Sequence, residues 1–408
     1  MMSSKSDKSK VSVWCLASIS AVPLIMTLGN SMLIPVLPIL EKKVSISSFQ
    51  SSLIITSYSV ASILLIPIAG YLSDRFGRKM ILLPSLAITF IGGLISGFAS
   101  WKMGNPYMTI IIGRIIQGIG SAGAFPIILP LVGDLYKNDD DASACLGIVE
   151  TSNTFGKVLS PILGAALALW IWYIPFFSIS FFSLISFLMV LFFIKVPKKK
   201  DDPIKLHDFL QEVKKIFHKD GKWLYCVFIT GAFIMLILFA VQFYLSNILE
   251  SRYDIHNIKK GFVLSIPLFF LCVASFITGK KIKDNIKAMK ILIICSLLIA
   301  AACIAFTSHL DNLFLLIGIL SIFGAGLGAI LPSLDALITE NIEKEERGTI
   351  MSFYSSARFL GVAVGPPLMS FFMKKNESYL FYSFSALAIL LLILIAKCIS
   401  AKSAESSS

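Results

Sequence analysis

YMTIIIGRIIQGIGSAGAFPIILPLV, residues 107–132, is an apolar stretch that contains the pattern G-x-G-x-x-G from Gly118 to Gly123. In a dinucleotide-binding domain this pattern follows a strand and opens a helix, so that free amides at the helix N-terminus face the pyrophosphate. Here the glycines lie inside a run long enough to cross a bilayer, where the helix uses its own amides. We therefore interpret them as small residues that let neighbouring membrane helices pack closely.

The whole chain has the composition of a membrane protein. Of its 408 residues, 56% are hydrophobic and 15% are charged, whereas soluble domains are about 25% charged. Because lipid offers the backbone no hydrogen-bond partner, each apolar run is expected to be a helix. The predicted fold class is an all-α membrane protein with twelve transmembrane helices, near residues 11–40, 50–73, 80–100, 107–133, 143–169, 172–194, 224–249, 261–279, 288–308, 313–339, 350–373 and 378–399.

The distribution of basic residues predicts the orientation of the chain. Most Lys and Arg residues fall in the segments that are cytoplasmic when the N-terminus is inside. Both termini are therefore expected in the cytoplasm of a multi-pass protein of the cell membrane, with a bacterial inner membrane the favoured location. Anionic lipid at the inner leaflet explains the net charge of +12 without nucleic-acid binding. The first apolar run is too long for a signal peptide and should be retained.

The sequence shows no pattern for a metal, a cofactor or catalysis. The seven cysteines form no C-x-x-C pair, so neither a metal site nor a disulfide framework is expected. The four histidines fall in loops or at the ends of spans, which argues against an enzyme. The chain also lacks the P-loop pattern that an ATP-driven pump needs. These absences predict a cofactor-free transporter that uses an ion gradient, and we expect it to be a monomer.

One long polar stretch divides the chain. It places six spans on either side, which predicts bundles at 1–194 and 223–408 and a cytoplasmic linker at 195–222. The linker carries apolar residues at helical spacing, so it is expected to form an amphipathic helix that is either solvated or lies on the inner membrane surface. These apolar residues are Leu206, Phe209, Leu210, Val213, Ile216 and Phe217.

The two halves also look duplicated. Three pairs of residues recur at a constant separation: Asp134 with Asp335, Gly147 with Gly348, and Lys157 with Arg358. A duplication of six-helix units, with a substrate site between them at the bilayer midplane, is an architecture of secondary transporters. A site between the halves is therefore expected.

Three stretches carry recognisable signatures. GYLSDRFGRK (70–79) lies between the second and third spans, and RIIQGIGSA (114–122) lies in the fourth. The fifth span contributes Gly147, Gly156, Ser160, Pro161, Gly164 and Ala165. Together they resemble the major facilitator superfamily, most closely its twelve-helix drug/proton antiporter branch, although Ser160 and Ala165 replace two glycines of the antiporter pattern. The resemblance implies two six-helix bundles, and it implies helix-packing roles for Gly147, Gly156, Pro161 and Gly164.

The first signature predicts a cytoplasmic gate. Asp74 can face the positive end of a neighbouring helix, and Arg78 can reach Asp134 at the inner end of the fourth span. By resemblance, such contacts would hold the halves closed on the inside. The alternative is a static turn whose cations only anchor the protein to the membrane. The candidate gate residues are Gly70, Asp74, Arg75, Gly77, Arg78 and Asp134.

Ionisable residues inside the spans are the candidates for coupling and substrate binding, because such groups are costly in lipid. Glu150 is the best proton acceptor, since the first span offers only Asn30 at mid-depth. A Glu150–Lys157 pair that merely neutralises itself is the alternative. Asp335 lies near the inner end of its span. The candidate proton-coupling and substrate residues are Arg114, Glu150, Lys157, Arg358, Asn30, Gln117 and Asn153.

The sequence supports one main functional prediction and several alternatives. By resemblance, the chain is expected to export drugs or drug-like amphipathic molecules in exchange for protons. The intramembrane cations outnumber Glu150, which favours an anionic cargo and hence, as the alternative, export of a siderophore or organic acid. An uptake symporter is disfavoured by the pattern of the fifth span. A membrane enzyme or receptor is disfavoured further, because no catalytic groups converge.

Overall fold

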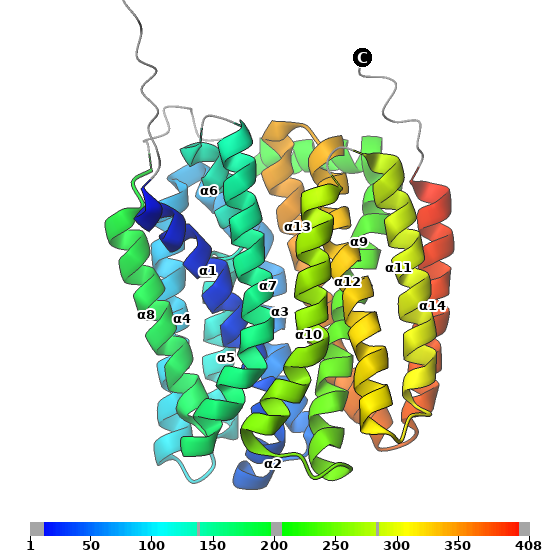
Figure 1. The fold of residues 1–408 in the computed structure, drawn as a ribbon. Coiled ribbons are helices and arrows are strands. Elements are labelled where there is room, and N and C mark those ends of the chain that lie inside the picture. Colours follow the sequence, from blue (N-terminus) through cyan, green and yellow to red (C-terminus); the bar gives the residue numbers. More distant parts are fainter. Residues whose placement is uncertain (1–11, 137–138, 197–205, 283–284, 400–408) are drawn as a thin grey trace, which may run out of the picture.

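The computed structural model describes residues 12–136, 139–196, 206–282 and 285–399, and these are helical with no strand among them (Figure 1). The first half contains α1 (Val13–Ser31), η1 (Ile34–Val36), α2 (Leu37–Val44), α3 (Ser48–Phe76), α4 (Arg78–Lys102), α5 (Tyr107–Ala122), α6 (Ile128–Leu135), α7 (Asp139–Trp170) and α8 (Ile174–Phe193). The second half contains α9 (Leu206–Ser251), α10 (Asn257–Lys281), α11 (Ile286–Thr307), α12 (Leu313–Asn341), α13 (Lys344–Met373) and α14 (Glu377–Cys398).

All of the expected apolar runs are helical, and within the described residues ten helical stretches are long and apolar enough to cross a membrane. The other two expected spans, 107–133 and 143–169, do not meet these criteria of length and hydropathy. The run 107–133 is split into α5 and α6 by a turn at 123–127, where Pro126 cannot donate a backbone hydrogen bond. The run 143–169 lies within the 32 residues of α7, which carries Glu150 and Lys157.

The helices form two bundles that meet along two seams. Helices α1–α8 pack mainly with one another, as do α9–α14, on the left and right of Figure 1. Between the bundles, α3 packs against α13 and α7 packs against α10. Helix α1 begins and α14 ends at the same end of the molecule, at the top of Figure 1. A site between the bundles is therefore bounded by helices from both halves.

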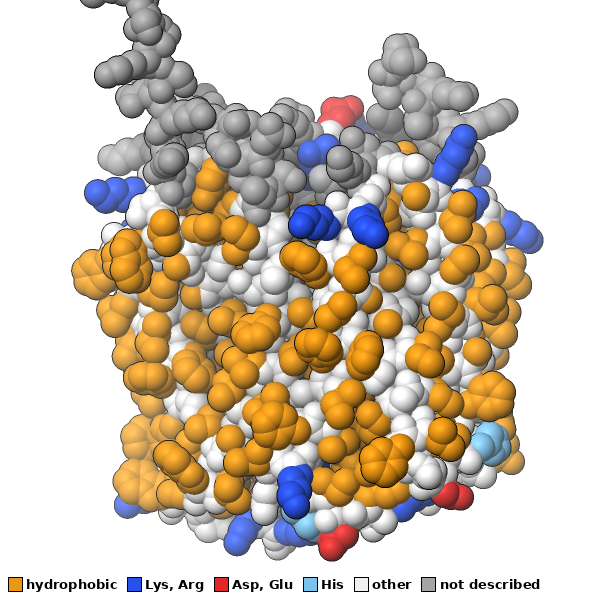
Figure 2. All heavy atoms as spheres, in the orientation of Figure 1, with side chains coloured by type: hydrophobic (Ala, Val, Ile, Leu, Met, Phe, Trp, Pro, Cys, Tyr) orange, Lys and Arg blue, Asp and Glu red, His pale blue; other side chains and the backbone are white. Residues whose placement is uncertain are grey.

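The flanks of the molecule are apolar. Figure 2 shows hydrophobic side chains covering the visible face, with charged side chains gathered toward its upper and lower margins. On α8 the exposed side chains include Phe181 and Phe192, which are 60% and 66% accessible. This distribution is what a bilayer requires, because an exposed apolar belt of this size is unfavourable in water. These two phenylalanines lie on the outside of the bundle.

A repeated helix cap supports the duplication of the halves. Lys79 on α4 donates to the carbonyl oxygens of Leu191 and Ile194 at the C-terminus of α8, at 2.8 and 2.7 Å. Lys290 on α11 donates in the same way to Ala396 and Ile399 at the C-terminus of α14, at 2.7 and 2.6 Å. A lysine is favourable at the C-terminus of a helix, because it donates to carbonyl oxygens that have no partner within the helix and lies at the negative end of the helix dipole. The same cap thus ties the third helix to the sixth in each half.

The expected linker helix is continuous with the seventh span. Residues 197–205 and the side chains of Leu206, Phe209 and Leu210 lie outside the described part, and α9 runs from Leu206 to Ser251. Ile216 is buried, and the ring of Phe217 packs 5.9 Å from Phe228 and 6.0 Å from Phe353. These two apolar residues therefore contact protein rather than the membrane surface.

The glycines of the opening stretch bring α5 against its neighbours. A Cβ atom at Gly118 would collide with the carbonyl oxygen of Tyr58 on α3, and one at Gly120 would lie 2.5 Å from the carbonyl oxygen of Ser85 on α4. In the second half Gly328 of α12 meets the backbone of α10 at Leu271 in the same way. The G-x-G-x-x-G pattern thus serves helix packing, as the sequence indicated.

Replacing Gly118 by alanine should destabilise the protein. The added methyl group meets backbone atoms, which cannot rotate away, so α5 must shift off α3 at a cost of about 1–3 kcal/mol. We expect a lower thermal unfolding temperature in detergent. Gly147→Ala is the matched control, because Gly147 is exposed and nothing lies within 4 Å of its added Cβ. Equal unfolding temperatures for the two variants would contradict close packing at Gly118.

Candidate functional site

A cavity of about 80 Å³ lies between the two bundles. Its wall combines polar groups with a larger apolar area of aromatic and methionine side chains. Such a mixture is typical of small-molecule sites, where a few polar groups set the orientation of the ligand. The lining residues from the first half are Met26, Thr27, Asn30, Ser31, Tyr58, Phe125, Asn153 and Lys157, and those from the second half are Met235, Phe239, Ser355, Arg358, Phe359 and Val362.

Each half contributes one cation to this cavity. Lys157 of α7 is only 8% exposed, and its Nζ atom has no hydrogen-bond partner in the structure. Arg358 of α13 comes from the other half, with its guanidinium 3.6 Å from Asp335 of α12 and 5.5 Å from the centre of the Tyr354 ring. The repeat that pairs Lys157 with Arg358 in the sequence thus places both at one cavity. An anion bound there would satisfy the lysine.

Glu150 lies one turn from the cavity wall. Its carboxylate oxygens accept from Asn153 Nδ2 at 3.3 Å, and Asn153 Oδ1 accepts from Thr27 of α1 at 2.5 Å. Asn153 and Thr27 line the cavity, so this chain of contacts joins the carboxylate to it. Lys157 Nζ makes no hydrogen bond to Glu150, although the two charges interact at longer range, so the neutralising pair stays an alternative. The coupling role of Glu150 stays a prediction.

Arg114 lies behind the cavity wall rather than in it. The side chain is fully buried and donates to Gln117 Oε1 at 2.8 Å and to Asn30 Oδ1 at 2.9 Å. It also donates to two helix carbonyl oxygens, those of Ile54 and Gly29, at 3.0 and 3.1 Å. These bonds tie α5 to α1 and α3. Arg114 and Gln117 are therefore not among the cavity residues, whereas Asn30 is.

The face of Tyr58 completes the surroundings of Arg114. The guanidinium carbon lies 4.5 Å from the ring centre, a cation–π distance, and Tyr58 itself lines the cavity. Buried charges are normally paired, and here amides, carbonyls and an aromatic face take the place of a carboxylate. The structure thus supports a packing role for Arg114, and a direct substrate contact would require Asn30 or Tyr58 to move.

The predicted cytoplasmic gate forms its ion pairs within the first half. Arg78 lies 2.5 Å from Asp74 and 3.1 Å from Asp134, and it also donates to Ser73 at 2.8 Å. Gly77 joins α3 to α4 with φ +100°, a conformation that L-residues avoid. The pair Arg78–Asp134 was expected, but it does not itself join the two bundles.

The two halves approach each other at this end where Gly70 and Gly348 face side chains of the opposite half. A Cβ atom at Gly70 of α3 would lie 2.8 Å from Ser352 Oγ of α13, and one at Gly348 would lie 3.9 Å from Pro130 of α6. Arg75 is exposed and bonds to Tyr71 of its own helix at 3.4 Å, so it makes no gate contact of this kind. The Arg78 network holds α3, α4 and α6 together at this end.

The packing residues of the fifth span divide into two groups. A Cβ atom at Gly164 would strike the carbonyl oxygen of Met32, and one at Gly156 would lie 3.1 Å from that of Leu24, so both glycines hold α7 close to the first helix. The carbonyl of Pro161 faces Gly261 of α10 across the seam. Gly147 has open space around it, which corrects the expectation that it packs.

Sequence reasoning placed Asp335 near a span end but did not include it in the site. The structure places it beside Arg358, and its Oδ1 atom is buried without a hydrogen bond. The aromatic lining, Tyr58, Phe125 and Phe359 among it, was also missed. The duplication already aligned Asp335 with Asp134, which was the available signal for its place in a cation–carboxylate pair.

The described residues hold no group of three or more His, Cys, Asp or Glu side chains that could bind a metal, and their seven cysteines are free. The residues that line the cavity can bind a ligand by charge, hydrogen bonds and apolar contact.

Comparison with known proteins identifies the family. Residues 19–366 and 261–408 each match the family model described as the Major Facilitator Superfamily. The chain belongs to the major facilitator superfamily. A bacillibactin exporter of Bacillus subtilis (strain 168) is 53% identical to this facilitator over 390 residues, which is 95% of this chain and 97% of that protein. Multidrug resistance protein 2 of the same organism is 23% identical over 368 residues, covering 87% of each chain.

A solved structure shows the same fold. The crystal structure of the human organic anion transporter MFSD10 (TETRAN) superposes with a TM-score of 0.75 at 18% identity, and covers 94% of this facilitator and 99% of the human chain. The two-bundle, all-helical architecture predicted from the sequence is thereby confirmed. This protein is a multi-pass membrane transporter of the facilitator family.

Proposed function

We propose that this transporter exports an anionic siderophore across the cytoplasmic membrane. The observation that carries the proposal is the near full-length, 53% identity with a bacillibactin exporter. The cavity agrees with it, because the site between the halves presents Lys157 and Arg358. Of the two cargo classes that the sequence suggested, the siderophore alternative is thus better supported than drugs.

The unpaired lysine is the physical argument for an anionic cargo. A buried ammonium group without a hydrogen-bond partner costs several kcal/mol, a cost that selection removes unless the group has a use. Lys157 Nζ is such a group, and the residue lines the cavity between the halves. An ionised oxygen of the cargo would supply the missing partner, while a lipophilic cation would be repelled.

Alternating access supplies the mechanism. The cavity has walls from both bundles, and the bundles touch along α3–α13 and α7–α10. Rocking about these seams would expose the cavity to one side of the membrane at a time. Glycines and Pro161 at the seam α7–α10 allow the backbones to lie close while they move. Cargo on Lys157 and Arg358 would be carried between the two sides.

Drug efflux remains the second candidate, because the apolar wall would also suit amphipathic drugs. Its residues are Met26, Phe125, Met235, Phe239, Phe359 and Val362. A relative named multidrug resistance protein 2 shares 23% identity with the chain. The two cations disfavour the cationic compounds of this class.

Transport into inverted membrane vesicles would decide between the two cargoes. We expect vesicles that contain the protein to accumulate bacillibactin when a pH gradient is imposed, and to take up a lipophilic cationic dye no faster than empty vesicles. Dye uptake without bacillibactin uptake would establish drug efflux instead. Lack of transport of either compound would contradict both proposals.

Proton coupling is proposed to run through Glu150. Glu150→Gln removes the titrating group but keeps the hydrogen-bond geometry with Asn153. We expect it to abolish uptake driven by a pH gradient while leaving cargo exchange between equal pH values intact. Glu340→Gln, at an exposed site on α12, is the matched control. Normal gradient-driven uptake by Glu150→Gln would exclude this residue as the coupling site.

The topology proposed for this cycle follows the sequence. Both termini lie in the cytoplasm, residues 1–194 and 223–408 form the moving bundles, and 195–222 links them. The end of the molecule at which α1 begins and α14 ends is then the inner side (Figure 1). The transporter works as a monomer, because its cavity is completed within one chain.

A further inference from the structure

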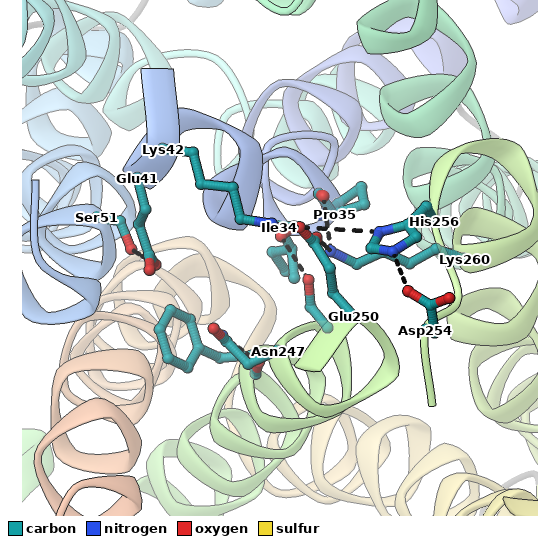
Figure 3. Close-up of polar contacts among 12 residues, drawn as sticks. Ile34, Pro35, Glu41, Lys42, Ser51, Asn247, Glu250, Asp254, His256 and Lys260 are labelled. Carbon is teal, nitrogen blue, oxygen red and sulfur yellow. Dashed lines mark hydrogen bonds and ion pairs between the residues drawn. The ribbon is translucent and has the colours of Figure 1, made fainter. Parts of the chain in front are cut away.

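A cluster of charges joins the halves at the end of the molecule opposite to the start of α1 and the end of α14 (Figure 1 and Figure 3). Lys42 of α2, in the first half, lies 2.6 Å from a carboxylate oxygen of Glu250 on α9, in the second half. The other oxygen of Glu250 lies 3.2 Å from Lys260 of α10. One carboxylate therefore binds a lysine from each half.

Two further bonds cross the same boundary. Lys260 Nζ donates to the carbonyl oxygen of Pro35 at 3.0 Å, and Ser246 Oγ donates to that of Ile34 at 2.9 Å. Both acceptors lie in η1, the bend that follows α1. These contacts hold η1 and α2 against α9 and α10 (Figure 3). Polar contacts with Glu250 at their centre thus hold the two halves together at the proposed outer end.

The burial of these groups differs. The side chain of Lys260 is 3% exposed and that of Glu250 is 10% exposed, whereas that of Lys42 is 70% exposed. Removing the charge of Glu250 would leave Lys260 as a buried cation without its carboxylate, which is unfavourable. Separation of the halves would let water reach Lys260 and relieve this cost. The carboxylate charge therefore stabilises the closed outer end selectively.

We propose that Glu250 is a proton-sensitive latch of the outer gate. While ionised it holds the two halves together. The two lysines favour the ionised form, so release needs external acid strong enough to protonate a lysine-paired carboxylate. The cavity then opens outward, where a cargo would leave. This inference rests on the alternating access of the proposed function, but it does not depend on which cargo is carried.

Other charged groups near Glu250 come from α2 and from the start of α10. Glu41 accepts from Ser48 and Ser51 at 2.7 and 2.5 Å, within the first half. His256 lies 3.9 Å from Glu250 and 2.7 Å from Asp254, within the second half. Neither Glu41 nor His256 bonds across the boundary here. The charged groups that face the latch are Glu41, Lys42, Asp254, His256 and Lys260.

Outward opening can be measured without transport. Ser31 lines the cavity, so a cysteine there can react with a membrane-impermeant maleimide added outside intact cells only when the outer gate opens. The seven natural cysteines would be replaced by serine. Rates are divided by those of an exposed cysteine at Asn105, in the outer loop between α4 and α5, to correct for thiol ionisation and for the amount of protein at the surface.

The latch variants have distinct expected results. At neutral external pH, Glu250→Gln should raise the corrected labelling rate by about tenfold or more, because it leaves a buried cation unpaired. Its rate should then be insensitive to external acid, whereas the rate of the protein with an intact Glu250 should rise on acidification. Glu41→Gln removes a neighbouring carboxylate that makes no bond across the boundary and interacts with Lys260 only at longer range, so it should raise the rate much less than Glu250→Gln.

A double variant distinguishes the cost of an unpaired Lys260 charge from a general weakening of the contacts between the halves. Glu250→Gln combined with Lys260→Met removes both buried charges, so the gate should return toward slow labelling. Equally fast labelling by the single and double variants would overturn the electrostatic latch. So would slow labelling by Glu250→Gln, or loss of the acid response in His256→Asn while Glu250 is intact. A failed bacillibactin transport assay would leave these labelling results, and hence the latch, unaffected.

Discussion

Replacing Lys157 by methionine is expected to weaken the binding of an anionic siderophore by about 10–100-fold, because a charge-assisted hydrogen bond contributes about 1.5–3 kcal/mol. Methionine has a similar length and keeps the apolar contacts of the side chain. The measurement is equilibrium binding of bacillibactin to the purified protein in detergent. Lys102→Met, at an exposed lysine near the outer end of α4, should leave the affinity unchanged.

Thermal unfolding of the same variant distinguishes a binding role from a structural one. Lys157 Nζ is buried and has no hydrogen-bond partner, so its removal takes away an unpaired charge. Lys157→Met should therefore unfold at the same temperature as the native protein or at a higher one. Weakened binding together with lower stability would contradict a substrate role, as would an unchanged affinity.

Replacing Arg114 by methionine should lower the stability of the protein, in contrast to the Lys157 variant. Four acceptors lose their donor, on Ile54, Gly29, Asn30 and Gln117, and all four residues are buried. We expect a loss of about 2–4 kcal/mol in unfolding free energy, because each unsatisfied buried group costs about 1–3 kcal/mol and the helices relax in part. The measurement is thermal unfolding in detergent, with surface expression as a second readout.

The conservative variant tests this structural role. Arg114→Lys keeps the charge but replaces a planar fork of donors by a single ammonium group, so it should recover part of the lost stability. The transport rate should fall together with the unfolding temperature, from the native protein to Arg114→Lys to Arg114→Met. A stable Arg114→Met protein that binds cargo but no longer couples to protons would instead show that Arg114 acts in coupling, as the sequence had suggested.

Local signals in the sequence predicted most of the helices and much of their packing, although not the turn at 123–127 or the open surroundings of Gly147. The long apolar run around Gly118 excluded a dinucleotide site, and the collision of an added Cβ with Tyr58 shows why glycine is required there. The signature at 70–79 likewise predicted the Arg78–Asp134 ion pair. Each inference used a property of the chain that depends little on distant residues, such as hydropathy, residue size or the end of a helix.

Site residues were harder to assign, because the face that a charged residue presents is set by packing. Arg114 and Lys157 look alike in the sequence, as single cations inside apolar spans. In the structure Arg114 donates hydrogen bonds to helix carbonyls and side-chain amides. The amine of Lys157, a residue that lines the cavity, makes no hydrogen bond. Asp335 could not be joined to Arg358 from the sequence, because neither spacing nor periodicity fixes the rotation of α12 against α13.

The sequence by itself determined that this protein is a duplicated bundle of membrane helices, because apolar length and the absence of backbone partners in lipid leave no other fold. Only the tertiary structure decided which polar groups meet. Lys42 and Glu250 lie far apart in the chain and yet close the outer end together, at 2.6 Å. Such a contact depends on how two bundles dock, and docking is a property of complete surfaces rather than of any local stretch.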